Sequence, residues 1–396
     1  MDNRSGRRPI SLLSIVGTRP EAIKIAPVAL AAAGRPAIVH QILATGQHEA
    51  LFDDALSAFG LTADLRAPPS LPDPSPDIMA GRLTEALAPI LAATRPDMVL
   101  VQGDTTSAYA TAIAAYRAGI PIAHIEAGLR SYDFDHPWPE ERNRVAIDRM
   151  ATLLFAPPPE AAANLGHDGD VSGHVFITGN TGIDALLAMR ARLPDNRPPQ
   201  AVDPALVLLT CHRRESIGAG IADICAAALR LAAREDVRML CPVHPNPAVG
   251  DTVRTLLGRH PRITLTGALS YPDMVAAMAA SRLILSDSGG IQEEAPALGI
   301  PVLVLRDVTE RPEGLASGNL ALVGTDPDRI VAAATRLLDD PGAHAAMARP
   351  AFPFGDGHAS EKILDHIERY FLPAPIGEHP LPFAPVWIKE RALKGA

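Results

Sequence analysis

The sequence predicts an α/β protein with two doubly wound domains. Short apolar runs such as Met98–Val101 and Leu206–Leu209 are bounded by polar turns, which is typical of buried strands in a parallel sheet. Alanine-rich helical stretches alternate with such runs over residues 10–180 and again over residues 205–325. At 396 residues the chain is also longer than one hydrophobic core usually grows. We therefore expect two domains that face a cleft, with ligands at the carboxyl ends of the strands.

The domain limits follow changes in composition. Residues 192–204 are rich in turn formers and poor in periodic apolar positions, which predicts a linker or a loop at a domain edge. A helix near the C-terminus is expected to pack back on the N-terminal domain. The predicted parts are an N-terminal domain at 1–180, a linker region at 181–204, a C-terminal domain at 205–358, a C-terminal helix at 359–372 and a tail at 373–396.

Composition disfavours several classes of protein. The net charge of −9 argues against a general nucleic-acid surface, because binding a phosphate backbone needs a basic face. The apolar runs are too short to span a bilayer, and no small-residue cleavage site follows Ile10–Val16, so we interpret that run as the first strand. The three cysteines, Cys211, Cys225 and Cys241, lack metal-type spacing and are odd in number, so they do not indicate a disulfide framework, which favours a cytoplasmic protein in a reducing compartment.

The first strand leads into a turn with two candidate ligand-binding cations. Gly17 permits a tight turn and Pro20 suits the start of the next helix, so Arg19 is expected to reach the cleft. Only four of the 36 basic residues are lysines, which marks Lys24 as a position where a planar guanidinium does not fit. The alternative is a capped helix with solvated charges.

Three carboxylates follow predicted strands or open a helix. Asp104 follows the strand at 98–101, Glu126 follows the strand at 122–125, and Glu140 opens a helix after a loop stiffened by prolines. Each one alone is also explained as a helix cap or a first-turn acid. Two carboxylates at the ends of neighbouring strands indicate acid–base chemistry.

Positive groups gather at strand ends in the second half. His212 and Arg213 follow the strand at 206–209, where a diphosphate bound by an acidic protein would need them. His244 ends another strand, and Arg311 follows the strand Val302–Leu305. A histidine at such a place is also compatible with a structural role.

The turn Asp287-Ser-Gly-Gly290 predicts an anion site. It lies between a buried strand and a short helix, so the backbone amides of Ser288, Gly289 and Gly290 would meet phosphate at the positive end of the helix dipole. Glu294 falls one helical turn later, where its carboxylate can accept two hydrogen bonds from a vicinal diol such as that of ribose. The predicted ligand is a nucleotide.

Other motifs are missing from the sequence. It contains no G-x-G-x-x-G, no G-x-x-x-x-G-K-[ST] and no metal-ligand cluster of convincing spacing. We therefore expect no cofactor and no metal, and nicotinamide and phosphoryl-transfer chemistry are both disfavoured.

The ordered set of motifs closely resembles the non-hydrolysing UDP-N-acetylglucosamine 2-epimerase family over residues 10–371. The strings that carry the resemblance are Gly17-Thr-Arg-Pro-Glu-Ala-Ile-Lys24, Thr45-Gly-Gln-His48, Gly103-Asp-Thr-Thr106, Glu126-Ala-Gly-Leu-Arg130, Pro137-Trp-Pro-Glu-Glu141, Thr178-Gly-Asn-Thr181, His212-Arg-Arg-Glu215, Asp287-Ser-Gly-Gly-Ile-Gln-Glu-Glu-Ala-Pro296 and Thr309-Glu-Arg-Pro312. The resemblance implies a GT-B fold, with two Rossmann-like domains facing a central cleft, and usually a homodimer. It also implies an isomerase that interconverts UDP-GlcNAc and UDP-ManNAc for cell-surface polysaccharide biosynthesis.

Matching the motifs residue by residue implies roles for the candidate residues. The family's phosphate and uridine contacts fall on Arg19, His212, Ser288, Gly289, Gly290 and Glu294, and its essential acid–base positions fall on Asp104, Glu126 and Glu140. Lys24 matches an active-site position, and we assign Arg213, His244 and Arg311 to UDP binding as well.

The family's chemistry is an elimination followed by a re-addition. A base removes the C2 proton as UDP leaves C1, and UDP then adds back to the 2-acetamidoglucal intermediate. We expect Glu126 and Asp104 to transfer protons with Glu140 supporting them, while Arg19 and His212 stabilise the leaving diphosphate. Which carboxylate takes the first proton stays open.

The sequence departs from the family pattern at three places. Bacterial members of the family often bind a second, activating UDP-GlcNAc through residues just after a Gln-His pair and through the loop that follows. Here Gln47 remains, but Glu49 and Ala50 come after His48, and the proline-rich segment 67–77, predicted as an exposed loop, replaces the expected loop. Activation by a second UDP-GlcNAc is therefore expected to be weak or absent. Met274 stands where relatives place an aromatic residue near uracil, and its thioether can still pack on a ring.

The sequence is also compatible with four other functions. An epimerase for a related nucleotide sugar and a GT-B glycosyltransferase both fit the predicted nucleotide cleft, but the glycosyltransferase would not require three acidic positions. A hydrolysing epimerase would release free N-acetylmannosamine. A nucleotide-sugar sensor would bind UDP-sugar without exchanging its C2 hydrogen.

Overall fold

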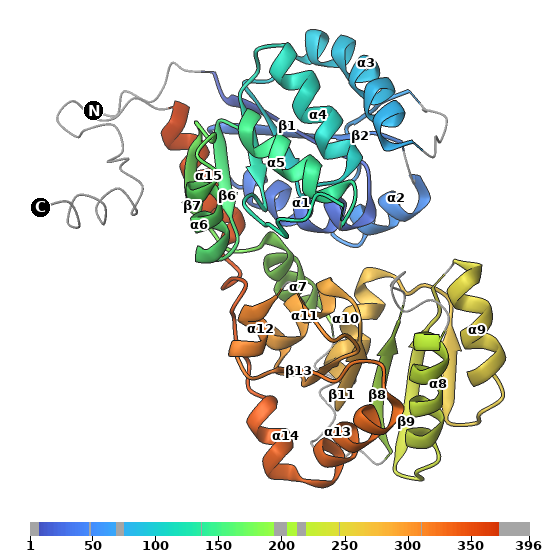
Figure 1. The fold of residues 1–396 in the computed structure, drawn as a ribbon. Coiled ribbons are helices and arrows are strands. Elements are labelled where there is room, and N and C mark those ends of the chain that lie inside the picture. The colour runs from blue at the N-terminus through green and yellow to red at the C-terminus, as the bar shows by residue number, and fades with distance from the viewer. Residues whose placement is uncertain are drawn as a thin grey trace, which may run out of the picture. The chain divides into compact units, whose positions relative to one another are not determined.

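The computed structural model describes residues 8–46, 49–68, 75–135, 137–193, 204–211, 219–244, 246–309 and 311–371. These residues form two compact units, each built on its own sheet (Figure 1). The first unit holds the described residues up to Ala185 and those from Gly355 onward, and the second unit runs from Leu186 to Phe354. Both are α/β units with parallel sheets, so the expected fold class, GT-B with two Rossmann-like domains, is confirmed.

The first unit contains a seven-stranded sheet in the order β3-β2-β1-β4-β5-β6-β7. Its strands are β1 (Ile10–Val16), β2 (Ile38–Ala44), β3 (Leu65–Arg66), β4 (Met98–Gln102), β5 (Ile122–Ile125), β6 (Leu153–Ala156) and β7 (His174–Ile177). Every described strand pair is parallel. The order reverses between β1 and β4, which pair through Leu12↔Met98 to Ser14↔Leu100. Ligands of such sheets bind beyond the carboxyl ends of strands at this switch point.

Helices connect these strands. They are α1 (Arg19–Ala33), α2 (Glu49–Ser57), α3 (Pro76–Thr94), α4 (Thr106–Arg117), α5 (Glu140–Met150), α6 (Pro159–His167), α7 (Thr181–Arg192) and α15 (Ala359–Phe371). Helix α3 begins inside the segment 67–77 that was predicted as loop, because Pro76 suits the first helical position and Ser75 caps the helix. The range predicted as linker, 181–204, begins with α7, whose Ile183, Leu186 and Met189 are buried.

The second unit contains a six-stranded sheet in the order β10-β9-β8-β11-β12-β13. Its strands, also parallel, are β8 (Ala205–Thr210), β9 (Val237–Pro242), β10 (Ile263–Thr266), β11 (Leu283–Ser286), β12 (Val302–Val304) and β13 (Leu320–Leu322). Its helices are α8 (Ala219–Ala232), α9 (Pro247–Leu257), α10 (Tyr271–Ala280), α11 (Gly289–Leu298), α12 (Pro312–Ala316), α13 (Pro327–Asp339) and α14 (Pro341–Met347).

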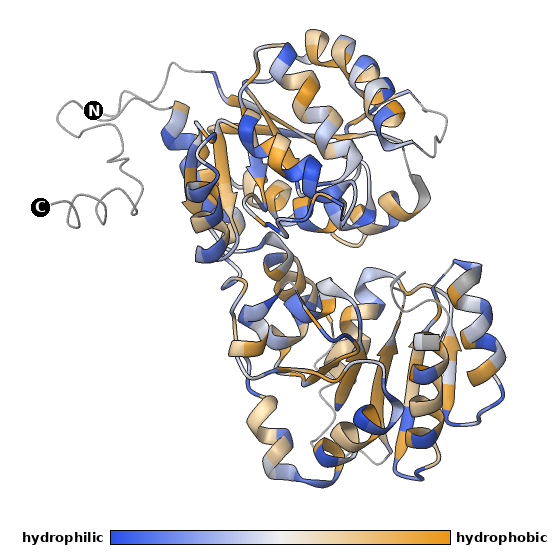
Figure 2. Ribbon diagram, viewed as in Figure 1, coloured by the Kyte–Doolittle hydropathy of each residue, from blue (hydrophilic) through white to orange (hydrophobic). Residues whose placement is uncertain are grey.

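The central strands are apolar on both faces because helices cover both sides of each sheet. Every residue of β4 is buried, and the strands are mostly hydrophobic while the helices carry one polar and one apolar side (Figure 2). Ala108, Ala112 and Ala115 of α4 are fully buried, and their small side chains let the helix approach the sheet closely. No described helix is long and apolar enough to cross a membrane.

Helix α15 completes the first unit. Asp184 accepts hydrogen bonds from the backbone amides of Ala359 and Ser360 at 3.2 and 2.7 Å, at the start of the helix. Further along, the Arg35 guanidinium lies 2.6 Å from the Asp365 carboxylate. The His366 ring stacks on Phe176 with 3.8 Å between ring centroids. The N-terminal and C-terminal parts of the sequence therefore share one core.

Candidate active site

Glu126, Lys24 and Gln102 meet at the carboxyl ends of β4 and β5. Lys24 Nζ lies 2.6 Å from Oε1 and 2.7 Å from Oε2 of Glu126, and the Gln102 side-chain amide donates to Oε2 of the same carboxylate. The Lys24 and Glu126 side chains are 19% and 10% exposed. A carboxylate held from two sides has a fixed direction, as an acid–base group at a reacting carbon requires.

Chain topology explains why these three residues meet. Gln102 is the last residue of β4, Glu126 follows the last residue of β5, and the two strands pair with Gln102 opposite Ile125. Lys24 lies in α1, which follows β1 at the switch point of the sheet. The structure thus places Lys24, predicted as a substrate contact, directly on the predicted catalytic carboxylate.

Asp104 is held by helix α5. Its Oδ2 atom lies 2.5 Å from Nη2 of Arg144, and its backbone carbonyl accepts a hydrogen bond of 2.9 Å from the Asn143 side chain. Sequence reasoning missed Arg144. The sequence does indicate Arg144 indirectly, because it lies four residues after Glu140 and therefore on the same face of the helix.

The two neighbouring glutamates at the start of α5 have different surroundings. Glu141 is buried and accepts hydrogen bonds from the backbone amides of Ser131 at 2.9 Å and Tyr132 at 3.1 Å. It therefore serves to hold the preceding loop. Glu140, the predicted acid–base residue, is only partly buried at the helix start. A ligand can therefore reach Glu140 more easily than Glu141.

Arg19 begins α1 beside a turn that is fixed by a buried carboxylate. Glu21 accepts hydrogen bonds from the amides of Gly17 and Thr18 at 2.9 and 2.6 Å, and from the Thr105 hydroxyl at 2.6 Å. Burial raises the pKa of Glu21, while these hydrogen bonds oppose the rise. A Cβ atom at Gly17 would lie 2.2 Å from Ser107 Oγ, so this position requires glycine. The turns after β1 and β4 are thereby locked together.

The serine-glycine turn of the second unit opens helix α11. Ser288 is the N-cap, and Gly289 and Gly290 are the first two helical residues. A Cβ atom at Gly289 would lie 2.6 Å from Cζ of Arg311, so the guanidinium lies against the glycine backbone. Arg311 Nε also donates to Glu293 at 2.7 Å, which orients the guanidinium. A positive side chain and the positive end of a helix dipole thus lie together.

Gly290 has a different environment from Gly289. Apart from its chain neighbours and the backbone of its own helix, no described protein atom lies within 4 Å of the place where its Cβ would stand. Packing within the second unit therefore does not require glycine here, and an open surface lies beside the turn. Such a surface lets a ligand approach the backbone closely.

Glu294, one turn into α11, has a buried tyrosine as a partner. The Tyr271 hydroxyl donates to Oε1 of Glu294 at 3.2 Å. Burial, aided by the Glu294 charge, raises the pKa of Tyr271 well above its usual value, so the phenol keeps its proton. Sequence reasoning missed Tyr271, although it opens the helix that carries Met274, a partly buried residue one turn later.

The remaining predicted site residues are placed as follows. His244 follows β9, and its Nδ1 accepts from the Asn246 amide at 3.2 Å, which leaves the proton on Nε2. His212 and Arg213 lie outside the described residues, as does Gln47. Glu49 and Ala50 lie at the start of α2.

The cysteines are unsuited to nucleophilic chemistry. Cys211, Cys225 and Cys241 are all buried and unpaired. Burial raises the pKa of the Cys225 thiol to about 11 and that of Cys241 to about 12. Within the described part of the chain, no group of three or more histidine, cysteine or acidic side chains is arranged to hold a metal ion.

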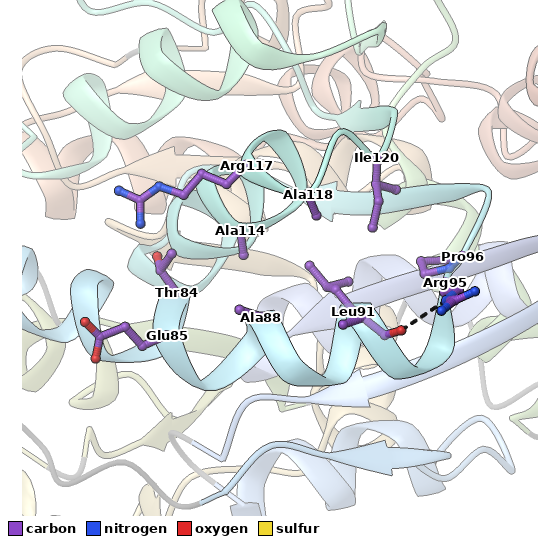
Figure 3. Close-up of a pocket in the computed structure, with 11 residues that line it drawn as sticks. Thr84, Glu85, Ala88, Leu91, Arg95, Pro96, Ala114, Arg117, Ala118 and Ile120 are labelled. Atoms are coloured by element: carbon purple, nitrogen blue, oxygen red, sulfur yellow. Dashed lines mark hydrogen bonds between the residues drawn. The ribbon is translucent and has the colours of Figure 1, made fainter.

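A groove of about 590 Å³ lies between α3 and α4, on the first unit (Figure 3). Its lining residues are Thr84, Glu85, Ala88, Leu91, Ala92, Arg95, Pro96, Ala114, Arg117, Ala118 and Ile120. None of the predicted site residues is among them. The groove is therefore distinct from the cluster around Glu126.

The chain is similar to known proteins over most of its length. A family model described as UDP-N-acetylglucosamine 2-epimerase matches residues 30–368. The UDP-N-acetylglucosamine 2-epimerase of Escherichia coli (strain K12) is 42% identical over 370 residues, which cover 91% of this chain and 98% of the relative. A structure of the Neisseria meningitidis UDP-GlcNAc 2-epimerase bound to UDP-GlcNAc has a TM-score of 0.85 at 39% identity, covering 91% of this chain and all of that one (100%). The Methanocaldococcus jannaschii UDP-GlcNAc 2-epimerase in complex with UDP-GlcNAc and UDP has a TM-score of 0.77 at 30% identity, covering 91% and 99%.

Proposed function

Because this chain belongs to the UDP-N-acetylglucosamine 2-epimerase family, we propose that it interconverts UDP-GlcNAc and UDP-ManNAc. The observation that carries the proposal is the Glu126 carboxylate, held by Lys24 and Gln102 at the switch point of the first sheet. Asp104, held by Arg144 at the end of the neighbouring strand, supplies a second acid–base group. Inversion at a carbon needs proton removal on one face and proton delivery on the other, so two carboxylates on adjacent loops suit the task.

The reaction begins with an elimination, because C2 of the sugar has no adjacent carbonyl to stabilise an anion. A carboxylate takes the C2 proton, the electrons of the C–H bond form a C1–C2 double bond, and the C1–O bond breaks as its electrons leave with UDP. In the second step a diphosphate oxygen adds to C1 while C2 receives a proton on the opposite face. Glu126 and Asp104 transfer these protons, and Glu140 supports them. The scheme needs neither a metal nor a nicotinamide.

In this proposal UDP is bound mainly by the second unit. The amides of Ser288, Gly289 and Gly290, together with the Arg311 guanidinium, meet the diphosphate, and Glu294 accepts from the ribose diol with Tyr271 fixing one carboxylate oxygen. His244 and Met274 are assigned to UDP as further contacts. Arg19, His212 and Arg213 are the remaining cations proposed for the leaving diphosphate, while Lys24 acts through Glu126.

Proton NMR in deuterated buffer tests the activity. Protein given UDP-GlcNAc alone should produce UDP-ManNAc and incorporate deuterium at C2 of both sugars. Glu126→Gln should strongly slow the appearance of both signals, whereas Glu160→Gln, which changes an exposed carboxylate on α6, should leave their rates unchanged.

Each rival activity predicts a different outcome of this experiment. A glycosyltransferase would leave UDP-GlcNAc unchanged until an acceptor is added, and a hydrolysing enzyme would release free N-acetylmannosamine. A sensor would bind UDP-GlcNAc without any exchange. An epimerase for a related nucleotide sugar would act on that sugar in preference to UDP-GlcNAc.

We also propose that the protein is a homodimer joined through the groove between α3 and α4. Ala88, Ala92 and Ala118 present small exposed side chains there, and Glu85 and Arg95 lie near opposite ends (Figure 3). A two-fold axis across the groove would set Glu85 beside Arg95 of the partner subunit, so one pair of opposite charges would meet at each end. Light scattering should give twice the chain mass. Ala88→Glu should give a monomer, and Ala93→Glu, on the same helix but outside the groove lining, should stay dimeric.

The proposed pathway role is the supply of mannosamine units for cell-surface polysaccharide, with the enzyme acting in the cytosol. The three unpaired thiols are compatible with a reducing compartment. Cell fractionation, and loss of mannosamine from the polysaccharide of a strain that lacks the enzyme, test these two points.

A further inference from the structure

A buried histidine ties the segment that carries Glu126 to its neighbours. His124, on β5 two residues before Glu126, is fully buried. Its Nδ1 lies 2.6 Å from Oδ1 of Asp148, and its Nε2 lies 2.9 Å from the carbonyl oxygen of Gly103. Because a carbonyl oxygen can only accept, Nε2 carries a proton in this arrangement. The imidazole therefore links helix α5 to the residue that directly precedes Asp104.

Asp148 also holds the chain on the other side of Glu126. Its Oδ2 accepts from the Gly128 amide at 3.3 Å and lies 2.7 Å from Nη2 of Arg130. Asp148 is fully buried, and the Arg130 side chain is 1% exposed. A Cβ atom at Gly128 would lie 2.2 Å from the Ala161 carbonyl oxygen, so the backbone there has little room to move. Asp148 thus contacts residues before and after Glu126 without contacting Glu126 itself.

The backbone of Glu126 needs such support. Its φ angle is +71°, in the left-handed region that side-chain-bearing residues rarely adopt, and such conformations persist only where the surroundings enforce them. The amides of Glu126 and Ala127 both donate to the Phe155 carbonyl, at 3.0 and 3.1 Å. These bonds fix one side of the turn, and Asp148 with its partners fixes the flanking residues.

Helix α5, which carries Asp148, also holds Asp104 and carries Glu140, the other two candidate carboxylates. Glu140, Arg144 and Asp148 are spaced by four residues and share one helical face. Glu140 is itself a candidate acid, Arg144 holds Asp104, and Asp148 holds the segment around Glu126. One helix therefore sets the positions of all three candidate carboxylates.

We propose that Asp148, acting through His124 and Arg130, is a positioning residue that aims Glu126 at C2 of the substrate. The inference rests on the proposed epimerase function. Removing the Asp148 charge leaves the buried imidazole and guanidinium without their shared partner, and the turn at Glu126 then relaxes. Because Asp148 does not touch the substrate, the chemical step suffers while UDP binding by the second unit does not.

The test compares Asp148→Asn with Asp170→Asn. Asp170 lies 3.2 Å from Nη2 of Arg149, the residue after Asp148 on α5, and both of these side chains are more than half exposed. Asp148→Asn should lower kcat for C2 deuterium exchange on the order of 10- to 100-fold with KM within about threefold, as expected for a displaced reacting group. Asp170→Asn, which removes only a surface ion pair to the same helix, should stay within about twofold of the parent in both quantities.

Further readouts separate positioning from folding. The kcat of each variant is normalised to the folded fraction measured by circular dichroism, and UDP affinity is measured by calorimetry. The positioning role predicts an unchanged UDP affinity and a displaced pH profile of kcat. If Asp148→Asn does not fold, His124→Gln, which keeps the Asp148–Arg130 pair, should show the same pattern with a smaller loss.

The activity of the parent protein tests the proposed function, and the activities of the variants test the positioning role. A parent protein that exchanges no C2 hydrogen overturns the proposed function itself. A parent that is active, with folded Asp148→Asn or His124→Gln matching its kcat and pH profile, overturns the positioning role alone.

Discussion

The two units place different kinds of groups at the carboxyl ends of their strands. In the first unit the candidate carboxylates are held by cations of the same unit, Glu126 by Lys24 and Asp104 by Arg144. In the second unit the candidate anion site is built from a helix start with two glycines and one oriented guanidinium. The first arrangement fixes the direction of acid–base groups, and the second offers donors to a ligand of negative charge. The comparison therefore separates residues that set the rate of the chemical step from residues that set nucleotide affinity.

The largest effect is expected at Glu126. Glu126→Gln should lower kcat on the order of 10³-fold, because the amide cannot take a proton from C2. UDP affinity measured by calorimetry should stay within about twofold, since UDP binding is assigned to the other unit. A Glu126→Gln protein with weakened UDP binding and near-parental kcat would reverse the assignment of the two units.

Lys24 should have the next largest effect. Lys24→Met removes the ammonium from Glu126, and kcat should fall on the order of 30- to 100-fold with an altered pH–rate profile. Lys24→Arg should restore little of this loss, because the ammonium already lies 2.6 and 2.7 Å from the carboxylate oxygens and the larger guanidinium would push Glu126 out of place. Full activity in Lys24→Arg would show that any positive charge beside Glu126 is enough to support the reaction.

The two glycines of the second unit form a matched pair for testing nucleotide binding. Gly290→Ala meets no described protein atom and improves helix propensity by about 1 kcal/mol, so the melting temperature should hold or rise. If the ligand occupies the open surface, the Kd for UDP should nevertheless rise about tenfold.

Gly289→Ala should behave differently. The new methyl group would push against Arg311, so thermal stability and UDP affinity should fall together. Equal UDP affinity in the parent and in Gly290→Ala would place the nucleotide elsewhere.

The smallest effect concerns the response of the first unit to acid. Burial lowers the pKa of His40 from 6.5 to about 4, partly opposed by Asp64, and its Nε2 lies 2.8 Å from Ser14 Oγ. The unfolded chain binds this proton more readily, so stability is lost as pH falls below 6.5, by about 1 kcal/mol between pH 6.5 and 5.5. Hydrogen exchange of β1 and β2 amides should show this loss in the parent and a smaller one in His40→Gln.

The features that the sequence predicted well are local. Buried strands such as β4 and β8, the turns at their ends and the helix start at Ser288 each follow from a short stretch of chain. The order of motifs, together with the residues at strand ends, was enough to predict the fold class and the family.

The features that could not be predicted depend on contacts between distant segments. Lys24 and Glu126 are separated by 102 positions, and their ion pair follows from the order of strands in the sheet. Glu140 and Glu141 are chemically identical neighbours, and only the folded loop shows that Glu141 is committed to the amides of Ser131 and Tyr132. The Tyr271 contact with Glu294 likewise needs two helices to be in place.

The position of α15 has a consequence for the order of events during synthesis. Residues 359–371 leave the ribosome after the whole of the second unit, yet their partners Asp184, Phe176 and Arg35 belong to the first unit. A nascent chain that has only reached Phe354 still exposes the surface that this helix will cover. The first unit is therefore synthesised first but completes its fold last. A stop codon ahead of Ala359 would harm this unit, which carries the proton-transfer residues, more than the second unit, which carries most of the nucleotide contacts.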